Sequence, residues 1–207
     1  MTTQRKDAPC PFGPEFEIYW SMRYELFSRF DEGIRTDAIG LRSVCPEKAA
    51  LEIGAMLRGE VVMDAFCGIG GTAIGLARSG KRVIAIDRDP ARLEMAADNA
   101  KIYGVAGRIT FVCGDTREEI TRHPVDAVFM DIPWGGPAYR SKPLFGLRDF
   151  LLDGVELLRL ALPRARYVAL RVPYNFNFQE FAPLRRDFHV HWFRMEVGVA
   201  FATVFLV

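Results

Sequence analysis

Short apolar runs alternate with amphipathic segments along most of the chain. The apolar runs predict buried β-strands over residues 61–63, 82–86, 109–113, 125–130 and 167–172. Apolar residues at helical spacing predict α-helices between these strands, over residues 72–78, 90–103 and 146–162. Strands that alternate with helices in this way are typical of an α/β fold with a mostly parallel sheet and helices on both of its faces.

The pattern changes at both ends of the chain. Residues 188–196 and 198–206 are two apolar strand candidates with no helix between them, which predicts an antiparallel hairpin at one edge of the sheet. Residues 15–30 carry aromatic side chains at roughly helical spacing. A further helix is expected over residues 46–57, because a proline in its first turn with an acid beside it is a helix-start signal.

Length and composition limit the class of protein. The chain has 207 residues, of which half are hydrophobic and 26% are charged, so one globular domain with an extension is expected. Lysine and arginine total 27 against 26 acidic residues, which excludes a uniformly basic surface for non-specific nucleic-acid binding. We divide the chain into a flexible N-terminus over residues 1–14, a helical extension over 15–57 and the main domain over 58–207.

Cysteine spacing and apolar run length argue against metal and membrane sites. None of the four cysteines forms a C-x-x-C pair or has a histidine at ligand spacing, so no metal site is expected. The longest apolar stretch, residues 197–207, is much shorter than the about 20 residues of a transmembrane helix. We expect a monomer that binds no membrane and works in the cytoplasm, or in the nucleus of a eukaryote.

Acidic residues stand at the ends of three successive predicted strands. Asp64 lies directly before a glycine-rich turn, Asp87 ends the second strand and Asp115 follows the third. An acid at such a turn would repel the pyrophosphate of a dinucleotide, whereas S-adenosylmethionine carries an ammonium group, a sulfonium and no phosphate. We therefore predict this cofactor, with its ribose hydroxyls on Asp87 and its adenine amino group on Asp115. The cofactor residues predicted in this region are Asp64, Phe66, Gly68, Gly70, Asp87, Arg88 and Asp115.

A fourth motif, Asp131-Ile132-Pro133-Trp134, ends the next strand and resembles the Asp/Asn/Ser-Pro-Pro-Tyr/Trp element of enzymes that methylate amino groups. An amine conjugated to a base ring is a poor nucleophile. Acceptors for its N–H groups, here the Asp131 side chain and the Ile132 carbonyl, would aim its lone pair at the methyl group. Trp134 offers a stacking face for the base, worth ~1–3 kcal/mol. We predict these four residues as the catalytic set, which acts by orientation more than by a strong base.

Several segments together resemble one family. These segments are residues 24–34, 61–71, 82–87 and 134–139. They look like the trimethylguanosine synthases, which are RNA cap guanine-N2 methyltransferases, and the resemblance runs over about residues 19–139. It implies a class I, Rossmann-like methyltransferase that adds one or two methyl groups to N2 of a 7-methylguanosine RNA cap. It also implies that the N-terminal extension packs over the cofactor and substrate site.

The resemblance also implies site residues, position by position. Asp64 and Asp87 fall on cofactor residues, and Phe27 falls on an extension residue near the cofactor. Trp134 falls on the tryptophan that stacks against 7-methylguanine, where a cationic base adds a cation–π contribution. The predicted substrate-binding residues are Trp134, Tyr139, Arg140, Tyr174 and Asn175.

The chain departs from the family pattern at several positions. Cys45, which we still assign to the cofactor site, stands where the family has a threonine, and Asp131 stands at the serine of Ser-Pro-Pro-Trp. Ile18 replaces a phosphate-binding lysine, and Tyr174 replaces the arginine of a Pro-Arg-Asn element. The loss of these two positive charges weakens the expected binding of the cap triphosphate. The cations that would compensate are Arg23, Arg29, Arg35, Arg140, Lys142 and Arg171.

Two other functions stay open on this evidence. One is an amino-methyltransferase that acts on an internal or uncapped guanine or adenine of RNA or DNA, which Asp131 and Ile18 favour. The other is a catalytically silent domain that binds RNA or a protein partner. Methylation assays on capped and uncapped RNA separate these possibilities.

Overall fold

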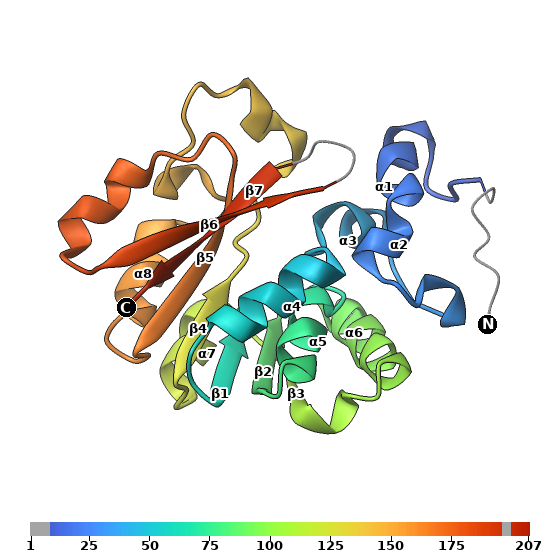
Figure 1. The fold of residues 1–207 in the computed structure, drawn as a ribbon, viewed down its shortest axis with the longest axis horizontal. Coiled ribbons are helices and arrows are strands. Elements are labelled where there is room, and N and C mark those ends of the chain that lie inside the picture. The colour runs from blue at the N-terminus through green and yellow to red at the C-terminus, as the bar shows by residue number, and fades with distance from the viewer. Residues whose placement is uncertain (1–8, 196–199) are drawn as a thin grey trace.

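Seven strands form one sheet in the computed structural model, which describes residues 9–195 and 200–207 (Figure 1). The strands are β1 Val61–Asp64, β2 Arg82–Asp87, β3 Ile109–Cys113, β4 Ala127–Met130, β5 Tyr167–Pro173, β6 Phe188–Arg194 and β7 Ala200–Leu206. The first five are parallel to one another, and β7 runs antiparallel to β5 and β6. The predicted sheet and C-terminal hairpin are confirmed, although Glu196, Gly198 and Val199 of the predicted hairpin lie outside the described residues.

The order of strands reverses beside β1. Across the sheet the order is β3-β2-β1-β4-β5-β7-β6, so the chain builds β2 and β3 on one side of β1 and β4 and β5 on the other. In open α/β sheets, ligands bind beside the carboxyl ends of the strands at such a switch point. Asp64 ends β1, and Asp131 follows the last residue of β4. The topology therefore brings two of the predicted motifs to one place.

Helices cover both faces of the sheet. Their bounds are α1 Glu17–Ser21, α2 Arg23–Leu26, α3 Ala38–Ser43, α4 Glu47–Met56, α5 Gly71–Arg78, α6 Pro90–Ile102, α7 Thr116–Arg122 and α8 Gly154–Ala161. Figure 1 shows α4, α5 and α6 on one face, α7 and α8 on the other, and α1 to α3 beyond one side of the sheet. The N-terminal segment thus forms helices, as its aromatic pattern predicts.

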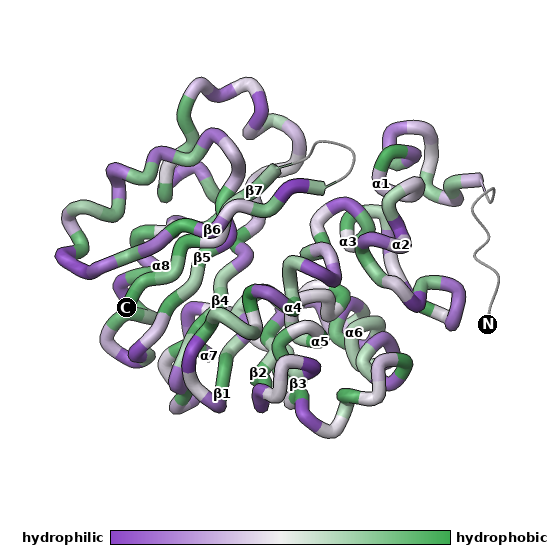
Figure 2. The backbone as a smooth tube through the Cα atoms, viewed as in Figure 1, coloured by the Kyte–Doolittle hydropathy of each residue, from purple (hydrophilic) through white to green (hydrophobic). Residues whose placement is uncertain are grey.

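Side chains along each strand point alternately to the two faces of the sheet, and a hydrophobic core lies on each face. Val62 and Phe129 pack with residues of α4, α5 and α6, whereas their neighbours Met63 and Met130 pack with residues of α7 and α8. Successive strand residues point to opposite faces, so a strand that is buried on both faces must be apolar throughout. Figure 2 shows this as hydrophobic colouring along β1 and β4. Trp134, which follows β4, packs against both cores.

One predicted helix is wrong in its extent. Residues 146–162 contain a 3-10 turn, Leu147–Asp149, and only then α8. The Asp153 carboxylate accepts a hydrogen bond of 2.8 Å from the backbone N–H of Val155, and this N-cap starts α8 anew. Between the turn and α8, Phe150 has an extended backbone and a buried side chain, so its packing interrupts the helix.

Two further segments differ from the predicted pattern. The pattern predicts no helix directly after β3, but α7 begins there because Asp115 caps it and accepts a hydrogen bond of 2.9 Å from the Arg117 N–H. The aromatic stretch over residues 15–30 forms two short helices, α1 and α2, rather than one long helix. The chain leaves the helical conformation at Phe27, whose backbone is extended.

Glu47, the first residue of α4, ties the extension to the sheet domain. Its Oε2 accepts hydrogen bonds from the Ser28 backbone N–H (2.7 Å) and the Tyr103 hydroxyl (2.6 Å). Its Oε1 accepts from the Ser28 hydroxyl (2.9 Å) and from Arg78 (2.6 Å). Burial acts to raise the pKa of this carboxyl, but these donors outweigh burial and hold the pKa below its usual value. One ionised side chain thus joins the extension to α5 and to the end of α6.

We expect Glu47→Gln to lower the free energy of unfolding by about 1–3 kcal/mol at neutral pH, because an amide cannot accept hydrogen bonds at both ends. The pKa of Glu47 is depressed in the folded state. Its contribution is therefore complete above the usual value of 4.5 and is lost as the pH falls through the lower folded value. Urea denaturation at neutral and acid pH measures this, with the exposed Glu60→Gln as control. A difference between Glu47→Gln and the parent protein that persists undiminished in acid would contradict this role.

Candidate active site

Asp64 ends β1 with a carboxyl group that is fully buried. Its Oδ1 accepts one long hydrogen bond, 3.4 Å, from the Phe66 N–H, and its Oδ2 is buried with no partner among the described residues. Burial, followed by the charge of Asp131, raises the pKa of Asp64 to about 7, against a smaller opposing effect of the backbone N–H groups of Phe66 and Ala73. A buried carboxylate oxygen without a donor fits a positively charged group, such as the ammonium of S-adenosylmethionine, which would supply the missing partner.

The glycine-rich turn after β1 leaves open space at its tip. Gly68 has a φ of +52°, a left-handed conformation that favours glycine, and a Cβ built there would meet no atom within 4 Å. Its N–H donates to Oδ2 of Asp87 over 2.8 Å, which fixes the turn beside the end of β2. Gly70 is the N-cap of α5, and Phe66 packs partly buried against one of the cores. The turn therefore combines a fixed backbone with room for a ligand.

Asp87 carries an oriented carboxylate at the end of β2. Besides the bond from Gly68, its Oδ1 accepts a hydrogen bond of 2.9 Å from the Asp89 N–H. Each carboxylate oxygen keeps a second lone pair, so the group can still accept from the two hydroxyls of a ribose. The next residue, Arg88, is exposed, and its carbonyl oxygen lies 3.8 Å from the Cys113 sulfur.

Asp115 lies beyond the neighbouring strand β3 but already has a partner. Its carboxylate accepts from the Arg117 N–H (2.9 Å) and forms an ion pair with the guanidinium of the same residue (2.6 Å). These hydrogen bonds lower the pKa of Asp115 to about 2. Its contact with an adenine amino group stays a prediction, in which the carboxylate would be shared with Arg117.

The predicted catalytic motif leaves β4 beside β5. The Oδ2 of Asp131 accepts a hydrogen bond of 2.7 Å from Nη1 of Arg171 on β5, and both side chains are largely buried. Burial raises the pKa of Asp131, and the charge of Arg171 opposes this shift. The Ile132 side chain is completely buried, and the Pro133 carbonyl accepts a hydrogen bond of 2.9 Å from the Leu151 N–H. The motif is thus held by contacts on both sides.

Trp134 belongs to an aromatic group with Tyr139 and Tyr174. Its ring meets Tyr139 edge to face with centroids 5.0 Å apart, and Tyr139 meets Tyr174 at 6.3 Å. Tyr139 is buried, whereas Tyr174 is 47% exposed. Arg140 donates from Nε to the Tyr139 hydroxyl (3.4 Å), and the Asn175 amide donates to the Tyr139 carbonyl (3.0 Å). The structure brings together the five residues that we predict to bind substrate.

The two cofactor residues predicted in the extension differ in their surroundings. Cys45 is buried, and its thiol interacts electrostatically with Arg171, Asp131 and Asp64. Burial raises the pKa of Cys45 to about 12, so the thiol is neutral. Phe27 is also buried, but its ring packs against Tyr103, 6.3 Å away, at the C-terminal end of α6. The structure therefore brings Cys45 to the acids at the switch point and joins Phe27 to the end of α6.

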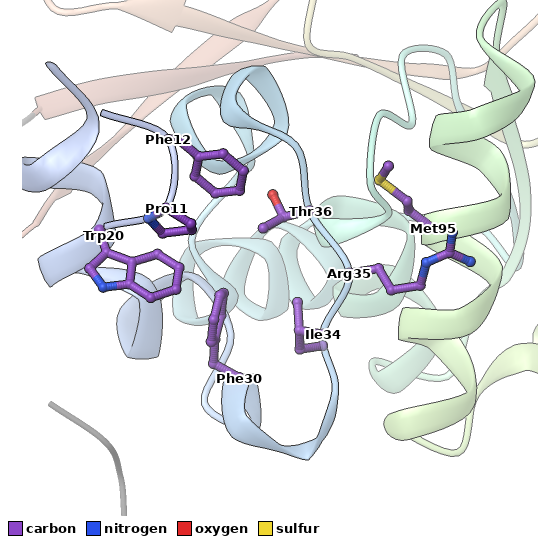
Figure 3. A pocket seen from close by; sticks show the side chains of 8 residues that line it. All are labelled: Pro11, Phe12, Trp20, Phe30, Ile34, Arg35, Thr36 and Met95. Carbon is purple, nitrogen blue, oxygen red and sulfur yellow. The ribbon is translucent and has the colours of Figure 1, made fainter. Parts of the chain in front are cut away.

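A cavity of about 320 Å³ lies between the extension and α6 (Figure 3). Its lining residues are Pro11, Phe12, Trp20, Phe30, Ile34, Arg35, Thr36 and Met95. None of the predicted catalytic, cofactor-binding or substrate-binding residues lines it. Arg35, one of the cations suggested for the triphosphate, does line it but is held by ion pairs to Glu94 (2.9 Å) and to Asp98. We assign this cavity to the packing of the extension.

The described part of the chain shows neither a metal cluster nor a membrane-spanning helix. Residues 9–195 and 200–207 contain no group of three or more histidine, cysteine or acidic side chains that could hold a metal ion. In the same ranges, no helix has the length and apolar character that crossing a membrane requires.

Three further residues help to shape the site. The sequence analysis gives two of them no role and names the third only as one of several cations. The buried Asn99 amide donates to the carbonyl of Ile69 in the glycine-rich turn (3.0 Å), and the Thr116 hydroxyl donates to the carbonyl of Ala65 (2.5 Å). Arg171, which the sequence suggests only as one of several cations for the triphosphate, is the ion-pair partner of Asp131. Two sequence features could have indicated these roles. Asn99 is a polar residue on the buried face of a helix, and Arg171 is a cation inside an apolar strand.

Comparisons with known proteins point in the same direction. A family model described as RNA cap guanine-N2 methyltransferase matches residues 59–202. The trimethylguanosine synthase of Schizosaccharomyces pombe is 38% identical over 185 residues, which cover 84% of this chain and 77% of that protein. The trimethylguanosine synthase of Saccharomyces cerevisiae is 29% identical over 182 residues, which cover 81% of this chain and 58% of that protein.

Solved structures share the fold. TrmN from Thermus thermophilus matches with a TM-score of 0.56 at 23% identity, over 90% of this chain and 52% of its own. A SAM-dependent O-methyltransferase from Thermotoga maritima matches with a TM-score of 0.58 at 18% identity, over 87% of this chain and 70% of its own. The class I, Rossmann-like methyltransferase fold is confirmed. With the family match over residues 59–202 and the relative at 38% identity, the resemblance is confirmed as well, and the chain belongs to the RNA cap guanine-N2 methyltransferase family.

Proposed function

We propose that this protein transfers a methyl group from S-adenosylmethionine to N2 of the guanine in a 7-methylguanosine RNA cap. The observation that carries the proposal is the proximity of two features at the switch point of the sheet. One is the buried carboxylate of Asp64, which suits a cation. The other is the motif from Asp131 to Trp134, which suits an amine on a base, and whose acid is close enough to raise the pKa of Asp64. Family membership supports the same reaction.

In this proposal, the glycine-rich turn and the strand-end acids hold the cofactor. S-adenosylmethionine, when bound, supplies a methyl group on a positively charged sulfur. Asp64 binds its ammonium, Asp87 binds its ribose hydroxyls, and Gly68 leaves it the necessary space. Because burial keeps the Cys45 thiol neutral, this nearby sulfur does not compete as a nucleophile for the methyl group.

The catalytic motif orients the amine. Arg171 binds Oδ2 of Asp131, so we assign the N–H groups of the guanine amine to Oδ1 and to the Ile132 carbonyl. This arrangement turns the nitrogen lone pair toward the methyl group, and Asp131 can hold the proton that N2 loses as its bond to the methyl carbon forms. Trp134 stacks against the base, and the positive charge of 7-methylguanine adds a cation–π contribution.

The extension and the partners complete the proposal. The Ser43 carbonyl at the end of α3 accepts a hydrogen bond of 3.0 Å from Arg171, which supports an extension over residues 15–57 that closes over the site. The partner is the capped end of an RNA, bound by a monomer in the cytoplasm or, in a eukaryote, the nucleus. Arg140 and Tyr174 would contact the cap beside the base.

A second candidate function follows from Asp131. An aspartate at this position, where the family pattern has serine, also suits an amino-methyltransferase that acts on an internal or uncapped guanine. The two candidates differ in the acceptor that they require and not in the cofactor.

Mass spectrometry of nucleosides tests the proposal. The protein is incubated with S-adenosylmethionine and one of three acceptors: RNA with a 7-methylguanosine cap, RNA with an unmethylated guanosine cap, or uncapped RNA. We expect N2-methylated 7-methylguanosine from the first acceptor alone. Equal methylation of uncapped RNA would replace the proposal with the second candidate, and no methylation of any acceptor would favour a silent binding domain.

A further inference from the structure

Arg171 is a buried cation inside an otherwise apolar strand. It lies on β5, pairs with Thr203 of β7 in the sheet register, and has a side chain that is only 9% exposed. Arginine is almost never buried to this extent unless its charge is paired. Its contacts therefore indicate what the residue does for the site.

These contacts join three segments of the chain at one guanidinium group. Nη1 donates to Oδ2 of Asp131 after β4 (2.7 Å) and to the Ser43 carbonyl of the extension (3.0 Å). The guanidinium carbon also lies 5.3 Å from the centroid of the Trp134 ring and 4.2 Å from that of Phe201. Arg171 thus touches both the predicted amine acceptor and the predicted stacking ring.

We propose that Arg171 is a positioning residue for methyl transfer, which holds the Asp131 carboxylate and the Trp134 indole in a fixed relation and balances the carboxylate charge beside the base. The inference rests on the proposed function, because it assigns Asp131 to the guanine amine. The planar guanidinium can bond a carboxylate in its plane while its face lies against aromatic rings, which an ammonium group cannot do equally well.

The charge of Arg171 keeps Asp131 able to accept hydrogen bonds. Burial alone favours the protonated carboxyl, and Arg171 opposes it. A protonated Asp131 would present an O–H donor to the N–H groups of the amine, and the lone pair would lose its orientation. The other titratable groups that face the pair are Asp64 of β1, Cys45 before α4 and Tyr139 after the catalytic motif.

The first test compares Arg171→Met with Arg171→Lys. For Arg171→Met, we expect kcat to fall about 100-fold, because the acceptor and the ring lose their relation. In this variant the pKa of Asp131 should rise, so the acid limb of the pH–rate profile should move to higher pH by about one unit. Arg171→Lys restores the charge without the planar group, so the limb should return while kcat stays about tenfold low. A merely structural role would lower kcat equally at every pH.

Two further variants keep the inference testable if Arg171→Met folds poorly. Asp131→Asn with Arg171→Met removes both charges of the buried pair. The loss of activity in this double variant should be smaller than the two single losses combined, because Arg171 then has no carboxylate left to position. Arg166→Met is the matched control, since Arg166 also lies against an aromatic ring, Tyr167, but is exposed beside the start of β5. We expect this control to retain the parent kcat and pH profile.

The outcomes separate this inference from the proposed function. An unaltered protein that methylates no RNA contradicts the proposed function itself. A parent enzyme that methylates the cap, together with an Arg171→Met variant of unchanged pH profile or strictly additive losses in the double variant, overturns the role of Arg171 alone. Affinity for S-adenosylhomocysteine should stay within about threefold of the parent in each folded variant, because Arg171 acts on the acceptor side.

Discussion

Replacing Trp134 with alanine should abolish methyl transfer to guanine and leave the affinity for S-adenosylhomocysteine nearly unchanged. The base would lose a stacking face worth ~1–3 kcal/mol, and a cationic base would also lose its cation–π contribution. Because stacking also sets the direction of the amine, we expect kcat/KM to fall by about 100-fold or more. Asp64 and Asp87, the acids assigned to the cofactor, end β1 and β2, so their geometry should persist.

Steady-state kinetics on capped RNA and calorimetric titration with S-adenosylhomocysteine measure the two effects separately. Trp134→Phe keeps an aromatic face and should recover part of the activity. Asp87→Ala is the opposite case, since losing this carboxylate should weaken cofactor binding first. Normal turnover by Trp134→Ala would show that the indole does not stack on the base.

Replacing Asp64 with asparagine should have opposite effects on binding and on stability. The buried carboxylate is the expected counter-charge of the cofactor ammonium, and breaking a buried ion pair costs about 3–5 kcal/mol, so the affinity for S-adenosylhomocysteine should fall by more than about 100-fold. The unliganded protein, by contrast, should become more stable at alkaline pH. It would no longer bury a charge that has no partner.

The pH dependence follows from the direction of the shift. The pKa of Asp64 is raised from 3.8 to about 7, so between these values the folded protein binds a proton that the unfolded chain does not. Its contribution to stability is therefore present below 3.8 and is lost as the pH rises through about 7. Asp64→Asn should remove this loss. Cofactor affinity should show the reverse trend in the parent protein, falling about tenfold per pH unit below this pKa because binding requires the ionised carboxylate.

Thermal denaturation without ligand, and calorimetry across the same pH range, test both trends for Asp64. Glu156→Gln, an exposed acid on α8, serves as the control. If Asp64→Asn bound S-adenosylhomocysteine as tightly as the parent protein, the assignment of Asp64 to the ammonium would be wrong.

Local sequence signals predicted the sheet and the acids at its edge. Strands of a parallel sheet that are buried on both faces must be apolar, so runs such as 61–63 and 82–86 are visible without a structure. The acids that end them follow directly in the chain, and parallel strands place their carboxyl ends at one edge. The positions of Asp64, Asp87 and Asp131 were therefore predictable as a group.

Interactions between distant residues were not predictable in this way. Arg171 and Asp131 are 40 positions apart in sequence, and their pairing depends on β5 lying next to β4. The same holds for Glu47, which meets Ser28 and Tyr103 only when the extension folds onto α6. The misjudged helix over residues 146–162 is different, because Asp153 is a cap signal that the apolar spacing obscured.

The close packing of α4 against α5 affects which part of the chain can fold independently. A Cβ at Gly75 would lie 2.5 Å from that of Ala50, so the two helices meet along a seam with no room for larger side chains. Removing the residues before 58 would remove α4 from this contact. It would expose α5 to solvent, although α5 is buried along most of its length. The Asn99 amide would also lose the Arg35 carbonyl, to which it donates a hydrogen bond. We therefore expect residues 59–202, which the family model matches, to fold only together with the N-terminal helices.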